Sequence, residues 1–202
     1  DHASIARGIG GPGAPAAHHR ANLGPYIKMD LLIPHLAATD KEGVIREMVQ
    51  RLADRGQTAD PVAALQAVLD RETVMSTGMQ DGIAIPHART DTASRLVCAI
   101  GLKPEGVAFD SLDGQPAQIF ALALSPKSVP APHMQFMATV ANCLDADGRR
   151  ALLLCRTPEQ MAVVLRGDLG ILKAHDQVIA EGEAPDTPER SHELTKEEGA
   201  PR

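Results

Sequence analysis

One histidine stands where an imidazole could do chemistry. His87 follows Pro86, which ends a short apolar segment at 83–85. The residue before a proline avoids the helical region, so this segment is expected to be extended, with His87 at a strand end beside a loop. Gly78 and Gly82 would let the backbone of the preceding loop approach a ligand. Because a neutral imidazole with a pKa of about 6.5 is a good nucleophile near pH 7, His87 could accept and later release a phosphoryl group.

Two more side chains could assist such a reaction. Arg71 could pair bidentately with a phosphoryl group and neutralise charge on its oxygens, or it could be a solvated arginine at a helix end. His133 follows a loop at 125–132 and begins a helical pattern. Its imidazole could hydrogen-bond phosphoryl oxygens or orient His87, or it could be a helix-end histidine without a role.

The hydroxyls of Ser76 and Thr77 could donate hydrogen bonds to a bound phosphate, but turn capping by the same residues is an equal alternative. Other chemistries have no motif in the chain: it contains no HExxH, CxxC, GxSxG or GxxxxGK[ST] pattern. We therefore expect no metal and no cofactor, and a phosphoryl donor other than ATP bound by this chain.

Helices are predicted on both sides of the stretch that contains His87. Thr39 with Glu42 fits a capping box, and Gly56 a helix stop. Asp60 and Thr157 each precede a proline, the pattern of an N-cap followed by Pro at the first helical position. Apolar residues recur at helical spacing in 44–52, in 62–69 as a shorter helix, in 134–144 and in 163–165, and more weakly in 169–179.

Between these helices lie two continuous apolar runs, 96–102 and 119–124, with a turn signal at 113–114. Uninterrupted apolar runs of this length are typical of strands buried on both faces. Helices before, among and after buried strands indicate an α/β domain over 29–166. The segment 1–28, rich in Gly and Pro, is expected to be a flexible leader or tag remnant.

Beyond the domain, 167–180 is expected to form a helical extension, and 181–202, rich in Glu and poor in apolar residues, a disordered tail. The formal net charge of −6 and the 2% aromatic content argue against a nucleic-acid partner. No apolar run approaches the roughly 20 residues of a membrane span. The three cysteines form no CxxC pair and are expected to be buried free thiols in a reducing cytoplasm.

The stretch 71–88 resembles the signature of the fructose, mannitol and nitrogen-regulatory type of enzyme IIA of the bacterial phosphotransferase system, above all at 76–78 and 82–88. The resemblance covers about 29–166 and implies a single mixed β-sheet flanked by helices. It also implies that His87 is the phosphorylated residue, that His133 matches a second active-site histidine, and that Arg71 matches the arginine of an Arg-Glu pair. In that family the Nε2 nitrogen carries the phosphate.

The same resemblance implies partners. The donor would be the phosphohistidine of an HPr-type phosphocarrier protein, and the acceptor a IIB domain or a regulated target protein. The chain would then be a phosphohistidine carrier of the phosphotransferase system rather than a free-standing enzyme. Three settings stay open: a nitrogen-branch regulator, a sugar-uptake relay, and a IIA domain of a larger transporter. Since no IIB or IIC segment is visible, regulation is slightly favoured.

Overall fold

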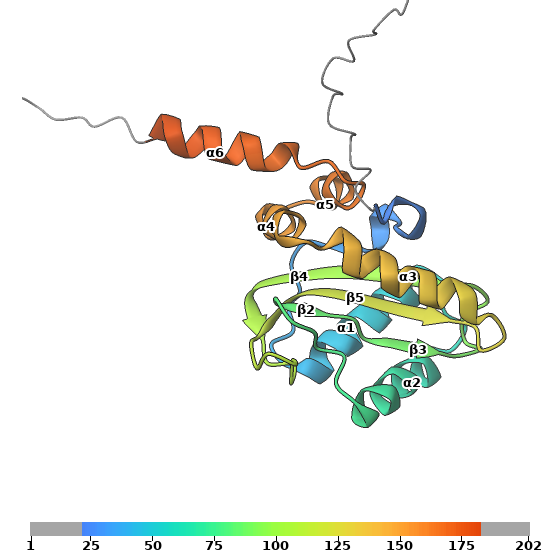
Figure 1. Ribbon diagram of the computed structural model, residues 1–202. Coiled ribbons are helices and arrows are strands. Elements are labelled where there is room, and N and C mark those ends of the chain that lie inside the picture. The colour runs from blue at the N-terminus through green and yellow to red at the C-terminus, as the bar shows by residue number, and fades with distance from the viewer. Residues whose placement is uncertain (1–21, 183–202) are drawn as a thin grey trace, which may run out of the picture.

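The structure, a computed structural model, describes residues 22–182 and has one mixed β-sheet with helices on both faces (Figure 1). The strands of this described part are β1 (Leu32–Ile33), β2 (Ile83–Ala84), β3 (His87–Arg89), β4 (Val97–Val107) and β5 (Ala117–Ser125). They lie in the order β1-β4-β5-β2, and β3 also pairs with β5. Only β4 and β5 are antiparallel to each other, while the three short strands run parallel to their neighbours. The sheet is thus mixed, as expected.

The two predicted apolar runs form β4 and β5, the centre of the sheet. They pair from Val97 opposite Leu124 to Leu102 opposite Ile119, and the turn between them contains Gly114 with φ of 70°. Successive residues face opposite clusters of buried side chains, because side chains alternate along a strand. Ile100 therefore belongs to one cluster and its neighbour Ala99 to the other. Burial on both faces confirms the prediction for these strands.

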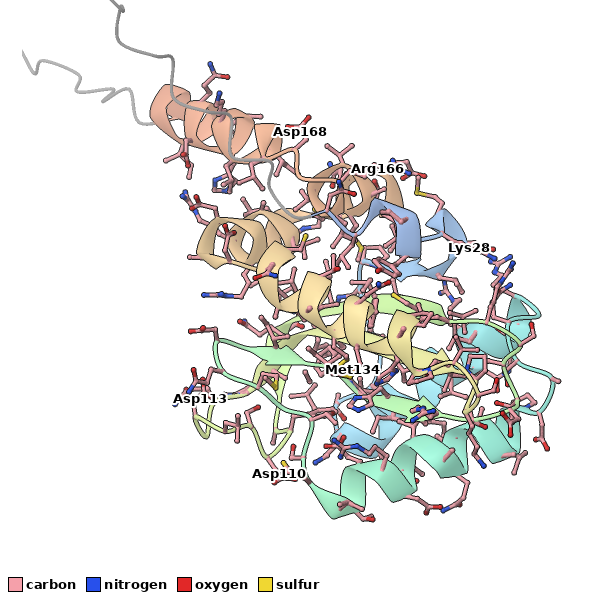
Figure 2. All side chains as sticks on the ribbon, turned by 45° about the vertical axis from the view of Figure 1, so that its right-hand side comes forward. Lys28, Asp110, Asp113, Met134, Arg166 and Asp168 are labelled. Atoms are coloured by element: carbon pink, nitrogen blue, oxygen red, sulfur yellow. The ribbon has the colours of Figure 1, made fainter. Side chains whose placement is uncertain are left out.

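Two helical layers provide those clusters. On one face lie α1 (Lys41–Asp54) and α2 (Pro61–Val74), and on the other α3 (Pro130–Cys143), with α4 (Ala146–Leu154) and α5 (Pro158–Leu165) beside it (Figure 1). The sequence did not predict α4. The apolar face predicted for 134–144, which begins at Met134, is also partly wrong. The residues that α3 buries are His133, Phe136, Val140 and Cys143. Met134 is 67% exposed on its outer side (Figure 2).

The helix starts follow the expected chemistry, with one shift. Asp60 and Thr157 cap α2 and α5 as predicted, each accepting a hydrogen bond from the third residue that follows it. The cap of α1 is Asp40 rather than Thr39: its Oδ1 accepts from the N–H of Gly43 at 2.7 Å. The second helix is not shorter than the first, since α1 and α2 each have 14 residues. The extra turn of α2 carries Arg71.

The folded part begins before the predicted boundary at residue 29. Leu23 is fully buried, and its N–H donates to the carbonyl of Leu165 at 2.7 Å. The ring of Tyr26 meets that of Phe136 edge-on, with centroids 5.4 Å apart. The prediction of a flexible leader through residue 28 is therefore wrong for its last residues, and residues 1–21 lie outside the described part.

At the other end, α6 (Gly170–Gly182) occupies the stretch expected to form a helical extension. The tail expected from residue 181 lies outside the described residues, apart from two positions at the end of α6. Within residues 22–182, no helix has the length and apolar character needed to cross a membrane. Cys98, Cys143 and Cys155 are all buried and form no disulfide in this part of the chain.

Candidate functional site

His87, His133 and Arg71, far apart in sequence, line one pocket of about 280 Å³ together with Arg89. The sheet brings the histidines together: β3 pairs with β5 in parallel, with His87 opposite Ala123, and β5 ends at Ser125 just before the loop to α3. The two imidazole centroids are 5.0 Å apart, and their planes meet at 54°. Both rings can therefore contact one small group placed between them.

The hydrogen bond at His87 fixes its tautomer. The Nδ1 atom lies 2.7 Å from the carbonyl oxygen of Ile85. A carbonyl can only accept, so Nδ1 carries the hydrogen and Nε2 keeps its lone pair. Burial, together with the charge of Arg71, lowers the pKa of His87 from its ordinary value of 6.5, although the bond to Ile85 opposes this. The imidazole is therefore neutral at pH 7, with its free lone pair on Nε2.

His133 is held from the opposite side. It is 7% exposed, and its Nδ1 lies 3.0 Å from Oγ of Ser125, a residue that is fully buried at the end of β5. Burial lowers the pKa of His133, and the charges of protonated His87, of Arg89 and of Arg71 lower it further. Ser125 was not predicted as a site residue. A polar residue ending an otherwise apolar strand was the available signal, but its partner could not be read from the sequence.

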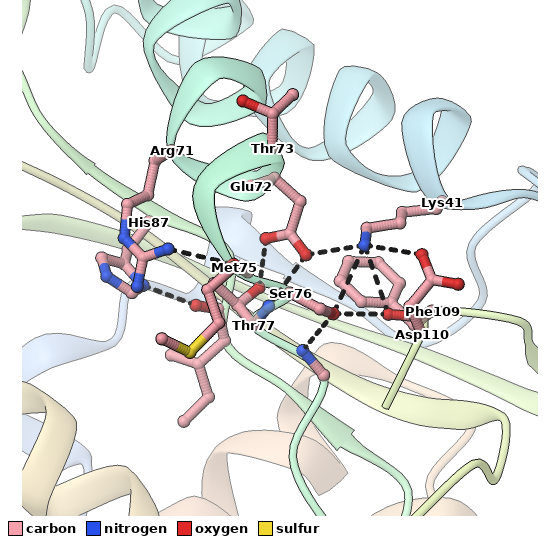
Figure 3. Close-up of polar contacts among 12 residues, drawn as sticks. Lys41, Arg71, Glu72, Thr73, Met75, Ser76, Thr77, His87, Phe109 and Asp110 are labelled. Carbon is pink, nitrogen blue, oxygen red and sulfur yellow. Dashed lines mark hydrogen bonds and ion pairs between the residues drawn. The ribbon is translucent and has the colours of Figure 1, made fainter. Parts of the chain in front are cut away.

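Two cationic side chains face the histidines. Arg71 lies in the last turn of α2, where its Nη1 donates to the carbonyl of Met75 at 3.0 Å and its guanidinium points toward His87 (Figure 3). Arg89 ends β3, and its Nη2 donates to the carbonyl of Lys127. From the sequence, Arg89 was only a weaker candidate for adding positive charge near His87, and the structure places it in the pocket. Two guanidinium groups beside neutral imidazoles make the pocket suited to an anion.

Ser76 and Thr77 lie away from this pocket. Oγ of Ser76 donates to the carbonyl of Phe109 at 2.7 Å, and Oγ1 of Thr77 donates to the carboxylate of Glu72 at 2.6 Å (Figure 3). Both hydroxyl hydrogens are thus committed to the protein. The alternative role in stabilising the turn fits this placement, and the predicted contact with phosphate does not.

Gly78 also has a role other than the predicted approach to a ligand. A Cβ at this position would lie 2.8 Å from the Cα of Ser111, so the glycine lets two loops pack closely. No group of three or more His, Cys, Asp and Glu side chains within residues 22–182 is arranged to hold a metal ion.

Comparison with known proteins places this chain in a family. Residues 24–167 match the family described as "Phosphoenolpyruvate-dependent sugar phosphotransferase system, EIIA 2". The chain therefore belongs to the EIIA type-2 family of the phosphotransferase system, as the resemblance of its signature had implied. The match includes both the β-sheet and all four residues named above that line the pocket.

Relatives of two kinds are similar to this chain. The fructose-specific EIIA component of Haloferax volcanii is 35% identical over 126 residues, which are 62% of this chain and 82% of that protein. A fructose-specific EIIABC component of Bacillus subtilis is 32% identical over 71% of this chain, which spans only 22% of that longer protein. A nitrogen regulatory protein of Bradyrhizobium diazoefficiens is 27% identical over 67% of this chain and 89% of its own length.

Solved structures confirm the fold. The nitrogen regulatory protein IIA-Ntr of Neisseria meningitidis superposes with a TM-score of 0.66 and 22% identity, over 71% of this chain and 98% of that one. The IIA mannitol enzyme of Escherichia coli, solved in complex with phosphorylated IIB mannitol, superposes with a TM-score of 0.62 and 23% identity. The superposition covers 70% of this chain and 98% of that one. The single mixed sheet flanked by helices is thus shared with a nitrogen regulatory protein and with IIA mannitol.

Proposed function

We propose that this protein is a phosphoryl carrier that holds phosphate on Nε2 of His87. The observation that carries the proposal is the hydrogen bond from Nδ1 of His87 to the Ile85 carbonyl, which leaves Nε2 as the nitrogen with a lone pair. The neighbouring Arg71 and Arg89 supply positive charge where a phosphoryl group would sit. Burial keeps the ring neutral and ready to attack.

The transfer is an exchange of one nitrogen–phosphorus bond for another. Nε2 of His87 attacks the phosphorus of an HPr-type phosphohistidine in line, and its lone pair forms the new bond. The old bond breaks, and its electron pair returns to the donor imidazole. The hydrogen on Nδ1 stays in its bond to the Ile85 carbonyl, so the ring's new positive charge lies beside a carbonyl dipole. Positioning and fixed positive charge carry out the catalysis, and the step itself calls for no metal.

His133 would bind the phosphoryl group as a hydrogen-bond donor. In this proposal the hydroxyl of Ser125 donates to Nδ1 of His133, which places the hydrogen of the neutral ring on Nε2. That N–H then donates to an oxygen of the group on His87. Ser125 is accordingly a positioning residue, since it acts only through the orientation and tautomer of His133.

Two acceptors are each supported by an observation. A sugar relay with a IIB domain is supported by the 35% identity to the fructose-specific EIIA component, of which the chain covers 82%. That relative is also a separate IIA component, so the lack of a visible IIB segment here does not favour regulation. A nitrogen-branch regulatory role is supported by a relative matched over 89% of its length. Either role would place the chain in the cytoplasm with its HPr-type donor.

Incubation with phosphoenolpyruvate, enzyme I and an HPr-type carrier tests the carrier function. Acid-labile phosphate should appear on the wild type and be absent from His87→Ala. His35→Ala is the control, because His35 is an exposed histidine outside the pocket. Label that persists in His87→Ala would refute the assignment.

The acceptor is then tested with the phosphorylated protein. Fructose-type and mannitol-type IIB domains should each be offered to it, and the loss of label followed over time. Transfer to either domain supports the sugar relay, whereas label retained with both supports the regulatory role.

A further inference from the structure

A buried carboxylate lies outside the pocket, one residue from Arg71. Glu72 is 7% exposed and points away from His87 toward α1 (Figure 3). One of its oxygens, Oε1, lies 2.8 Å from Nζ of Lys41 and accepts from the N–H of Thr77 at 2.8 Å. The other, Oε2, accepts from the Thr77 hydroxyl at 2.6 Å. The carboxylate thus clamps the segment that follows α2.

Lys41 extends this clamp to a second loop. Its Nζ also donates to Oδ2 of Asp110 at 3.1 Å, to the carbonyl of Phe109 at 3.3 Å and to Oγ of Ser76 at 3.3 Å. The ammonium lies 5.0 Å from the centroid of the Phe109 ring. One cation therefore ties together α1, the end of α2, the segment after it and the loop before β5.

From Thr77 the hydrogen bonds continue to the nucleophile. The carbonyl of Thr77 accepts from the N–H of Ile85 at 3.0 Å. The carbonyl of the same Ile85 accepts from Nδ1 of His87 at 2.7 Å. The backbone groups of Thr77 and Ile85 therefore link Glu72 to the imidazole through two residues.

The segment clamped by Glu72 also holds Arg71. The guanidinium of Arg71 donates to the carbonyl of Met75, two residues before Thr77. Movement of this segment would shift both the carbonyl of Met75, which orients Arg71, and the carbonyl of Thr77, which holds the backbone of Ile85.

We infer that Glu72, through Thr77, is a positioning residue that fixes the tautomer of His87 and the direction of Arg71. This inference rests on the proposed carrier function. It also gives Thr77 a role in place of the predicted contact with phosphate, because the side chain acts through the carboxylate and the backbone.

The charge state of the clamp fits this role. Burial opposes ionisation of Glu72, but hydrogen bonds from Lys41 and Thr77 outweigh it and lower the pKa of the carboxyl. Burial likewise opposes the charge of Lys41, but its bonds to Glu72 and Asp110 raise its pKa. Both groups are charged over the physiological pH range, so the ion pair between them is present throughout that range.

Three variants and one control test the inference. Thr77→Val removes the hydroxyl at nearly constant volume, Thr77→Ser restores it, and Glu72→Gln removes the charge. Glu47→Gln is the control, because Glu47 accepts in the same way from the N–H groups of Ala37 and Ala38, far from the pocket. Each protein is compared by the ¹⁵N chemical shifts of the His87 ring above its pKa, by phosphate transfer from HPr and by melting temperature.

The wild type and Thr77→Ser should show a single His87 tautomer with hydrogen on Nδ1. Thr77→Val and Glu72→Gln should show a mixture of tautomers and slower transfer, by about ten- to a hundredfold, the usual effect of losing a hydrogen bond to a charged group. Glu47→Gln should change the melting temperature only. Wild-type ring shifts in both Thr77→Val and Glu72→Gln would overturn the inference.

If Glu72→Gln fails to fold, Thr77→Val alone decides, since the carboxylate still has Lys41 as its partner. The imidazole signals need no phosphate donor. A wild type that takes up no phosphate but shows the expected tautomers would refute the carrier function and leave the positioning role intact.

Discussion

Neighbouring parts of one sheet differ in what holds them in place. β4 and β5 form a long antiparallel pair whose buried apolar side chains face two hydrophobic clusters. β2 and β3 have only two and three residues. Next to them, the N–H of Ile85 donates to the carbonyl of Thr77, whose own N–H donates to Glu72, and the N–H of Thr90 donates to the carbonyl of Ser125. Burial is nondirectional, whereas hydrogen bonds fix angles. The scaffold is thus stabilised mainly by buried apolar surface, whereas polar contacts orient the side chains of the site.

Two variants, one in the site and one in the scaffold, should show the largest difference between these parts of the sheet. His87→Ala should abolish phosphate uptake with little change in melting temperature, because the side chain packs at the edge of a pocket. Leu122→Ala, in β5 and fully buried, should lower the free energy of unfolding by about 2–5 kcal/mol, since it leaves a cavity. Its remaining folded fraction should still be labelled. Labelling assays and chemical denaturation measure the two effects, and equal effects of both variants on stability would contradict the division.

Loss of one polar contact in the pocket should have the next largest effect. Removing His133 or Arg71 should slow transfer by about 10²–10³-fold, the usual effect of losing one preorganised charge or donor. His133→Gln should be less impaired than His133→Ala, because its amide can still donate. The rates are measured by quenching transfer reactions with phosphorylated HPr at successive times. Wild-type rates in both His133→Ala and Arg71→Ala would rule out a shared site.

Removing the first folded segment tests the scaffold. A chain that begins at Met29 lacks Leu23 and Tyr26, which pack on the same cluster as α3 and α5. It should be less stable by at least about 2 kcal/mol than a chain that begins at Asn22, because a fully buried leucine contributes about that much. Unfolding of the two chains by urea gives the difference. Identical midpoints would show that the segment adds nothing to the core.

The smallest expected effect is on pH dependence. The pKa values of His87 and His133 are both lowered below 6.5, so the unfolded chain binds more protons than the folded one as the pH falls below that value. The free energy of unfolding should therefore decrease from about pH 7.5 to about pH 5. Replacing both histidines with Gln should flatten this slope, whereas His35→Gln should not. Phosphate uptake by the wild type should likewise decline at a lower pH than an imidazole with the ordinary pKa of 6.5 would give, because the pKa of His87 is lowered.

Local patterns in the sequence determined much of this protein. The apolar runs of β4 and β5, the caps Asp60 and Thr157, and the extended segment that ends at Pro86 depend on neighbouring residues, so they could be predicted. The signature around His87 likewise indicates the family through residue types and their spacing alone. The cap at Asp40 instead of Thr39 shows the limit of such patterns, since both residue types can accept the same hydrogen bond.

Contacts between distant residues could only be decided by the tertiary structure. Ser76 bonds to Phe109, which is 33 residues away, so nothing near it in sequence revealed that its hydroxyl was already committed. Arg89 faces His133 across the pocket because β3 pairs in parallel with β5, and Ser125 meets His133 because α3 begins close to the end of β5. Strand pairing depends on which faces can be buried together across the whole fold. For that reason residue types and their spacing predict His87, His133 and Arg71 as site residues, whereas the role of Ser125 became clear only from the folded sheet.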